Sequence, residues 1–228
     1  MIDLYFSPTP NGLKVRLFLE EAKLPYRIVP VRLSKGEQHR PDYVAIAPNS
    51  RIPAIVDDDG DTPLAMFESG AIMLYLAEKS GRLIPADMHG RAEVLQWLFW
   101  QMSALGPIAG QIGHFNVFAP ERVPYAIDRF SRELRRLYGV LDMRLRDREF
   151  IAGSYSIADI ACYPWIVPHR GHGQRLEEFP HLRRWFDAMS ARPATVRVYE
   201  DVEDVYAPAQ PMSAEERRIL FGRTAAAG

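Results

Sequence analysis

Residues 49–72 of the chain read NSRIPAIVDDDGDTPLAMFESGAI. Two short apolar runs, 52–56 and 64–67, flank an acidic cluster that contains a glycine, which is the pattern of two strands joined by a turn. The apolar spacing that begins at Glu68-Ser69 predicts a helix, and Gly81 stands where its C-terminus is expected. This stretch therefore predicts a β-hairpin followed by a helix.

The residues before the hairpin predict a strand, a helix and a second strand. Apolar residues alternate over 2–6, which indicates a strand that ends at the proline-containing turn 7–12. A helix is expected over about 13–22 and a strand over 26–33. The order β-α-β, a loop and then β-β-α predicts a small mixed sheet covered by helices.

Strand patterns disappear beyond about residue 90. Helical apolar spacing runs through four later segments, 91–105, 124–146, 156–167 and 180–191. We therefore expect an α+β/α two-domain chain, with a mixed-sheet domain over 1–84, a linker over 85–89 and an all-helical bundle over 90–206. The tail, 207–228, is either a short helix folded back on the body or a frayed end, and the frayed end is favoured.

The composition excludes several classes of function. The 28 lysines and arginines nearly balance the 29 aspartates and glutamates, so no basic field for nucleic acid is expected. No apolar run approaches the roughly 20 residues of a membrane helix, and the N-terminus lacks the pattern of a signal peptide. We expect a soluble, cytoplasmic protein with no nucleic-acid partner and no membrane partner.

Cysteine and histidine usage limits the redox and metal chemistry. The single Cys162 excludes a disulfide within the chain, a Cys-x-x-Cys pair and a cysteine-rich zinc site. It lies in an apolar helical segment with no basic residue one turn away, so a buried, inert thiol is favoured over a reactive one. The six histidines include no His-x-x-x-His pair, so no metal is expected.

The segment from Ser156 to Asp159 has the sequence of a helix capping box. The serine is placed to accept from the backbone amide three residues on, and Asp159 to reach back to the cap amide. The expected role is structural.

Two motifs around the hairpin fit either folding or ligand binding. Ile52-Pro53 either starts a strand or forms a cis peptide that leaves the Ile52 backbone free to pair with an extended ligand. Glu68 and Ser69 either cap a helix or bind a zwitterion, with the ligand carboxylate at the helix N-terminus and its ammonium group at Glu68.

The end of the first strand offers three further candidates. Thr9 and Asn11 are turn formers, but they also stand at the strand end where open α/β sheets bind ligands. Tyr5 is a candidate catalytic phenol, or a packing residue beside Phe6.

Taken together, these residues resemble the cytosolic glutathione transferase superfamily, over nearly the whole chain to about Tyr199. The resemblance is carried by residues 49–55, by 67–72 with Tyr75-Leu76, and by the Ser156–Asp159 box. Within the superfamily, five segments look like the Nu class, which includes bacterial disulfide-bond oxidoreductases and is related to the fungal nitrogen-regulator prion protein. These segments are 7–14, 95–101, 106–107, 114–116 and 124–129.

The resemblance implies a fold, an assembly and a set of binding residues. The fold is that of a glutathione transferase, with a thioredoxin-like, glutathione-binding domain over 1–84 and a helical domain over 90–206, assembled as a homodimer. Glutathione is implied as substrate or co-substrate, with no metal. By this resemblance, Pro53 is the cis-proline and Ile52 pairs with the cysteinyl backbone of glutathione. Glu68 and Ser69 bind the γ-glutamyl end, and Gln38 and Arg51 line the glycyl and cysteinyl region. Arg129 makes a contact across the dimer.

The same resemblance implies a chemistry at Thr9 and Asn11, which are expected to face the sulfur and favour the thiolate. The implied activity is that of a glutathione-dependent disulfide-bond oxidoreductase that uses ligand-borne thiols and binds glutathione disulfide or two glutathiones. The alternatives are conjugation of glutathione to an electrophile, assisted by Tyr5, and a glutathione-binding protein without turnover. The substrate pocket is expected between the domains, near residues such as Phe115, Trp165 and His169 that fit packing equally well.

Overall fold

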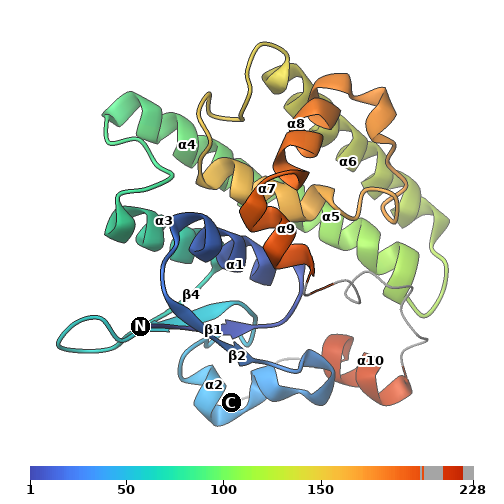
Figure 1. Cartoon of the computed structure of the whole chain (residues 1–228). Coiled ribbons are helices and arrows are strands. Elements are labelled where there is room, and N and C mark those ends of the chain that lie inside the picture. Colours follow the sequence, from blue (N-terminus) through green and yellow to red (C-terminus); the bar gives the residue numbers. More distant parts are fainter. Residues whose placement is uncertain (201, 203–212, 223–228) are drawn as a thin grey trace.

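A four-stranded mixed sheet in the order β2-β1-β3-β4 forms the centre of the first domain (Figure 1). The computed structural model describes residues 1–200, 202 and 213–222. The strands are β1 (Ile2–Phe6), β2 (Tyr26–Pro30), β3 (Ala54–Asp57) and β4 (Leu64–Phe67). β1 pairs in parallel with β2, while β3 runs antiparallel to both β1 and β4. The predicted order of elements along the chain, the mixed sheet and the hairpin are confirmed.

Two of the predicted strands are shorter than expected. β2 ends at Pro30 rather than residue 33, and β3 begins at Ala54 rather than residue 52. Because proline has no backbone N–H, Pro30 and Pro53 limit the ladder at these ends.

Different helices cover the two faces of the sheet. Helices α1 (Pro10–Ala22) and α3 (Ser69–Ser80) pack against the face that carries Ile2, Leu4 and Phe6, all of which are buried (Figure 1). The short helix α2 (Pro41–Val44) lies on the opposite face, where Tyr43 is buried beside Tyr5. The alternation expected for β1 is confirmed by its burial pattern.

The described elements of the second domain are helices and helical turns, apart from two isolated β-bridges within residues 150–154. The helical elements are α4 (Met88–Trp100), a π-helical turn (Gln101–Leu105), α5 (Gly106–Gly113), a second π-helical turn (His114–Phe118), α6 (Pro124–Leu145), α7 (Ile157–Ile166), the 3₁₀ turn η5 (Leu176–Glu178), α8 (Pro180–Ser190) and α9 (Pro193–Glu200). Met88 and His89, expected in the linker, form the first turn of α4, because the Asp87 side chain caps the helix by accepting from the Gly90 amide over 2.8 Å.

Helix α5 is absent from the sequence prediction because three of its eight residues are glycines, which have low helix propensity. Two of these glycines lie against Trp165: a Cβ at Gly106 or Gly110 would stand 3.4 or 3.5 Å from the indole. Tertiary packing therefore explains a helix that the local sequence disfavours.

Helix α1 lies between the sheet and the helical domain (Figure 1). Its C-terminal end is fixed by Glu21, which pairs with Arg192 over 2.6 Å and accepts from the Tyr155 hydroxyl over 3.0 Å. Helix α1, which carries Thr9 and Asn11 at its N-terminus, is therefore held by both domains.

The capping box at Ser156 is confirmed. Asp159 is fully buried and also accepts from the Ile151 amide and the Trp185 indole, each over 2.9 Å. Burial raises the pKa of Asp159 to about 6. The box therefore supports the core of the helical domain.

The expectation of a frayed tail is wrong for residues 213–222, while 207–212 and 223–228 lie outside the described residues. Helix α10 (Ala214–Phe221) begins with a capping box of Ser213 and Glu216 and packs beside the 3₁₀ turn η1 (Leu33–Lys35). Serine three residues before a glutamate is the signal that indicates this helix. Of the helices described, none has the length and apolar character to cross a membrane.

Candidate active site

Two adjoining cavities lie at the edge of the first domain and share Asn11, Asn49, Arg51 and Ile52. The larger, here called the main cleft, has a volume of about 1670 Å³ and is lined by both domains and by α10. The smaller, here called the inner pocket, has a volume of about 320 Å³ and includes Pro53, Phe67, Glu68 and Ser69.

Thr9 and Asn11 line the main cleft at the N-terminus of α1. The Thr9 hydroxyl accepts from the Gly12 amide over 3.4 Å, so its own proton is available to a further acceptor. The side-chain oxygen of Asn11 accepts from the Trp165 indole over 3.0 Å, which leaves the Asn11 amide N–H groups as donors. Two donors at a helix N-terminus favour an anion such as a thiolate.

The Thr9–Asn11 turn depends on the glycine that follows it. A Cβ at Gly12 would lie 2.3 Å from the carbonyl oxygen of Ser7 and 3.2 Å from the ring of Phe6. Any side chain at position 12 would therefore displace the turn.

The Ile52–Pro53 peptide bond is cis, as predicted. The loop before it is anchored by the Tyr43 hydroxyl, which donates to the Arg51 carbonyl over 2.7 Å. Ile52 lines both cavities and precedes the β3 ladder, which begins at Ala54. The Arg51 side chain lines the cavities without an ion pair to any described residue.

Glu68 and Ser69 meet at the start of α3. Glu68 has a φ of 70°, a value that residues other than glycine rarely adopt. Non-glycine residues with such backbone angles cluster at functional sites. Its exposed carboxylate accepts from Asn49 over 3.4 Å, whereas Ser69 is buried. The pair therefore presents one exposed anionic group beside one hydroxyl at a helix N-terminus.

Lys14 is a functional candidate that the sequence analysis missed. Its ammonium group is buried and donates to Gln101 Oε1 over 2.6 Å and to the Ser69 hydroxyl over 3.5 Å. Burial lowers the pKa of Lys14 to about 7, although Cys162 and Glu68 act in the opposite direction. Residues 12–19 of α1 are all buried, and the local apolar spacing gives no signal of this.

Cys162 is buried, as predicted. The sequence analysis finds no basic neighbour for it, but packing of α1 on α7 brings Lys14 near. Burial nevertheless raises the pKa of the thiol well above its usual value. An inert thiol is the outcome that this environment favours.

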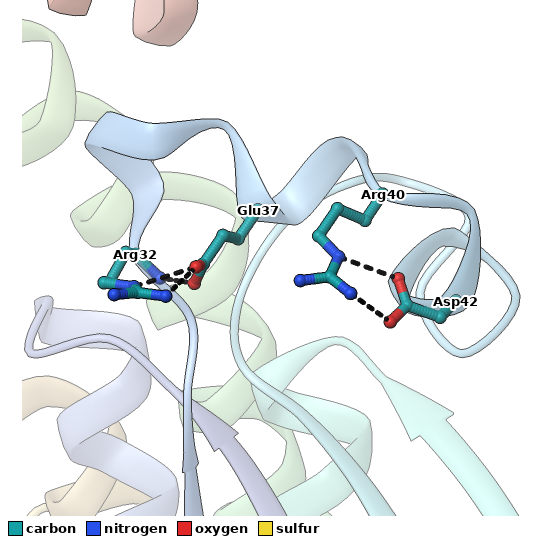
Figure 2. Close-up of polar contacts among 4 residues, drawn as sticks. All are labelled: Arg32, Glu37, Arg40 and Asp42. Atoms are coloured by element: carbon teal, nitrogen blue, oxygen red, sulfur yellow. Dashed lines mark hydrogen bonds and ion pairs between the residues drawn. The ribbon is translucent and has the colours of Figure 1, made fainter.

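Gln38 lies in a segment braced by two ion pairs. Figure 2 shows Arg32 bound to Glu37, with 2.8 Å from Nε to the carboxylate, and Arg40 bound to Asp42 over 3.1 Å. Gln38 is buried and lines the main cleft, and its Oε1 has no partner among the described residues. Both arginines of this segment thus have their own carboxylates, while Gln38 has a free acceptor.

Four of the sequence candidates lie outside the described linings of the two cavities. Tyr5 packs against Tyr43, with 5.8 Å between ring centroids, and is not among the described residues that line either cavity. Arg129 is exposed on α6, and it is likewise absent from the described linings, as are Phe115 and His169. The role of Arg129 in a dimer stays a prediction.

The ionisable side chains in the described lining of the main cleft are all arginines and histidines. Its described lining contains the arginines Arg51, Arg217 and Arg218 and the histidines His39 and His114, but no aspartate or glutamate. Within the described parts of the chain, no group of three or more His, Cys, Asp or Glu residues is placed to hold a metal ion. The cleft is therefore suited to an anionic organic ligand.

Comparison with known proteins agrees with this geometry. The N-terminal domain model of the glutathione S-transferase family matches residues 9–79, and the C-terminal domain model matches 106–193. The disulfide-bond oxidoreductase YfcG of Escherichia coli (strain K12) is 52% identical over 199 residues, which cover 86% of this chain and 93% of that protein.

Solved structures are similar over the same extent. A glutathione transferase from Burkholderia graminis, with two glutathione molecules bound per subunit, is 43% identical with a TM-score of 0.83, covering 89% of this chain and 88% of that one. A glutathione transferase from Pseudomonas putida, with one glutathione disulfide bound per subunit, is 41% identical with a TM-score of 0.82, covering 86% and 90%. The chain therefore belongs to the glutathione S-transferase family.

Proposed function

We propose that this protein is a glutathione-dependent disulfide-bond oxidoreductase of the Nu class. The observation that carries the proposal is the pair of hydrogen-bond donors, Thr9 and Asn11, at the N-terminus of α1, in a cleft whose only nearby protein thiol, Cys162, is buried. The donors suit a thiolate that arrives with the ligand. The names of YfcG and of the solved relatives that hold two glutathiones or glutathione disulfide support this reading.

The inner pocket is proposed to bind the first glutathione. Glu68 accepts from the γ-glutamyl ammonium group, and the Ser69 hydroxyl and α3 N-terminus bind the neighbouring carboxylate. The backbone of Ile52, held beside the cis Pro53, pairs with the cysteinyl residue, while Gln38 and Arg51 line the remaining part. This arrangement directs the sulfur toward Thr9 and Asn11.

The reaction proceeds by two exchanges between thiols and disulfides. Thr9 and Asn11 donate to the glutathione sulfur and favour loss of its proton to solvent, because a free thiol is mostly protonated at neutral pH. The thiolate attacks one sulfur of the substrate disulfide, forming a mixed disulfide and releasing the other half as a thiolate. A second glutathione thiolate attacks the mixed disulfide at the glutathione sulfur, giving glutathione disulfide and the second substrate thiol.

The assembly and location complete the proposal. The protein acts as a cytoplasmic homodimer, in which Arg129 of one subunit reaches across to the other. Its exposed position on α6 is compatible with such a contact.

The proposal is tested by reductase turnover with bis(hydroxyethyl) disulfide in Asn11→Ala, Thr9→Ala and Tyr5→Phe variants. Loss of one donor to a charged sulfur is expected to lower kcat by about tenfold or more in the first two variants. Tyr5→Phe, which changes a residue outside the described linings, should retain activity. Loss of activity in Tyr5→Phe alone, or tight glutathione binding by the wild type without turnover, would contradict the proposal.

A further inference from the structure

Helix α10 forms one wall of the main cleft, although it lies beyond both family domain matches, the second of which ends at residue 193. On the side of the first domain, Ile219 approaches Gly36, with 3.5 Å between the methyl carbon and the position of a Cβ there. On the side of the helical domain, Phe221 contacts His114 and Phe118, with ring centroids 4.9 and 5.6 Å apart. Figure 1 shows α10 beside the segment that follows β2.

Arg217 is the half-buried cation of this wall. Its guanidinium donates to the Phe118 carbonyl and has no carboxylate partner among residues 1–200, 202 and 213–222. Its neighbour Arg218 differs, because it is exposed and pairs with Glu215 over 2.7 Å. One carbonyl contact leaves most of the Arg217 N–H groups available, in a cleft whose described lining contains no acidic residue.

We propose that Arg217 is a specificity-determining residue that binds a carboxylate on the disulfide substrate. This inference rests on the proposed function. The attacking glutathione occupies the inner pocket near α3, so the opposite part of the main cleft, beside α10, receives the substrate. A guanidinium held there selects disulfides that carry carboxylates, including glutathione disulfide and glutathione mixed disulfides, over neutral or cationic disulfides of similar size.

The test uses three small disulfides that differ in charge: dithiodipropionate is anionic, bis(hydroxyethyl) disulfide is neutral and cystamine is cationic. For each, kcat/KM is measured at saturating glutathione with the full-length wild type, Arg217→Ala and Arg217→Glu. We expect Arg217→Ala to lower kcat/KM for dithiodipropionate by about tenfold, as for loss of one charge-assisted hydrogen bond, and to change the neutral substrate less than about twofold. Arg217→Glu should lower kcat/KM for dithiodipropionate further and raise kcat/KM for cystamine.

Two further variants keep the test specific. Arg146→Ala removes an exposed arginine paired with Asp147 and should leave kcat/KM unchanged for all three disulfides. Ile219→Asp, which places a charge where α10 meets Gly36, should reproduce the selective loss seen for Arg217→Ala.

Three outcomes would overturn the inference. The first is an equal loss for all three disulfides, which would place Arg217 on the attacking glutathione instead. The second is unchanged kcat/KM for dithiodipropionate in Arg217→Ala, and the third is retained anion preference in Ile219→Asp. Failure of the wild type to reduce any of the three disulfides would instead contradict the proposed function itself.

Discussion

The indole N–H of Trp165 on α7 donates to the side-chain oxygen of Asn11 on α1 over 3.0 Å. This hydrogen bond crosses from the helical domain to the first domain and fixes which end of the Asn11 amide remains free. A residue of one domain thereby sets the donor that the other domain offers to the cleft.

Trp165→Phe is expected to lower kcat by about fivefold, because loss of one neutral hydrogen bond removes the constraint on the Asn11 amide. KM for glutathione should change little, since Trp165 does not line the inner pocket and the proposed binding residues Glu68 and Ser69 are unchanged. Trp97→Phe is the matched control, because the Trp97 indole N–H has no partner among the described residues. Steady-state kinetics with bis(hydroxyethyl) disulfide would show the difference, and equal losses in both variants would argue against orientation of Asn11.

Lys14 should make stability depend on pH. The folded protein releases the Lys14 proton near pH 7, whereas the unfolded chain holds it to about 10.5, so unfolding takes up a proton between these values. Burial of the charged ammonium group therefore lowers the free energy of unfolding most strongly below pH 7, and this destabilisation declines as the pH rises. The stability of Lys14→Met relative to wild type should be greatest below pH 7 and fall by up to about 1.4 kcal/mol per pH unit above it.

Urea unfolding of the wild type, Lys14→Met and Lys35→Met over this pH range would measure the effect. Lys35 is exposed, so its variant controls for the loss of a lysine at the surface. A stability difference for Lys14→Met that stays constant with pH would contradict a buried, titrating ammonium group. A constant offset from the unpaired Gln101 oxygen does not affect the slope.

Asp159 and Ser156 should differ sharply in their effect on stability. Ser156→Ala removes one cap and is expected to cost about 1 kcal/mol. Asp159→Ala leaves the Ile151 amide and the Trp185 indole N–H without their acceptor, so we expect a loss of about 3 kcal/mol or more. Urea titrations at pH 7 with equal m-values would establish the ranking, and comparable losses in the two variants would refute it.

Cys162 should be dispensable for turnover. Cys162→Ala and Cys162→Ser are expected to retain nearly full reductase activity, and the thiol of the folded wild type should resist a disulfide reagent until the protein is unfolded. Thiol titration with and without denaturant, alongside kinetics, tests both points. A large loss of activity in a folded variant would require a role for the protein thiol.

The features that could be predicted from the sequence are those set by neighbouring residues. The β1 alternation, the acidic turn of the hairpin and the Ser156 capping box each depend on a few adjacent positions. Their local conformational preferences agree with the tertiary structure, so the pattern is sufficient.

The features that could not be predicted arise between segments far apart in the chain. Burial of Lys14 requires Gln101 and the packing of α1 on α7, and Asn11 meets Trp165 across 154 positions. The docking of α10 beside η1 is equally remote, although the Ser213–Glu216 capping box is a local signal for the helix itself. Periodicity indicates which face of a helix is apolar but not which partner covers it.

Helix α1 is bound to the helical domain at its beginning by Asn11, in its first turns by Lys14 and near its end by Glu21. Exchange of whole domains between relatives would therefore separate residues that work as one unit. A chimaera that takes its first domain from this chain and its helical domain from a relative must also carry the α7 surface with Trp165. Without that surface, such a hybrid keeps the donor side chain at position 11 but not its orientation.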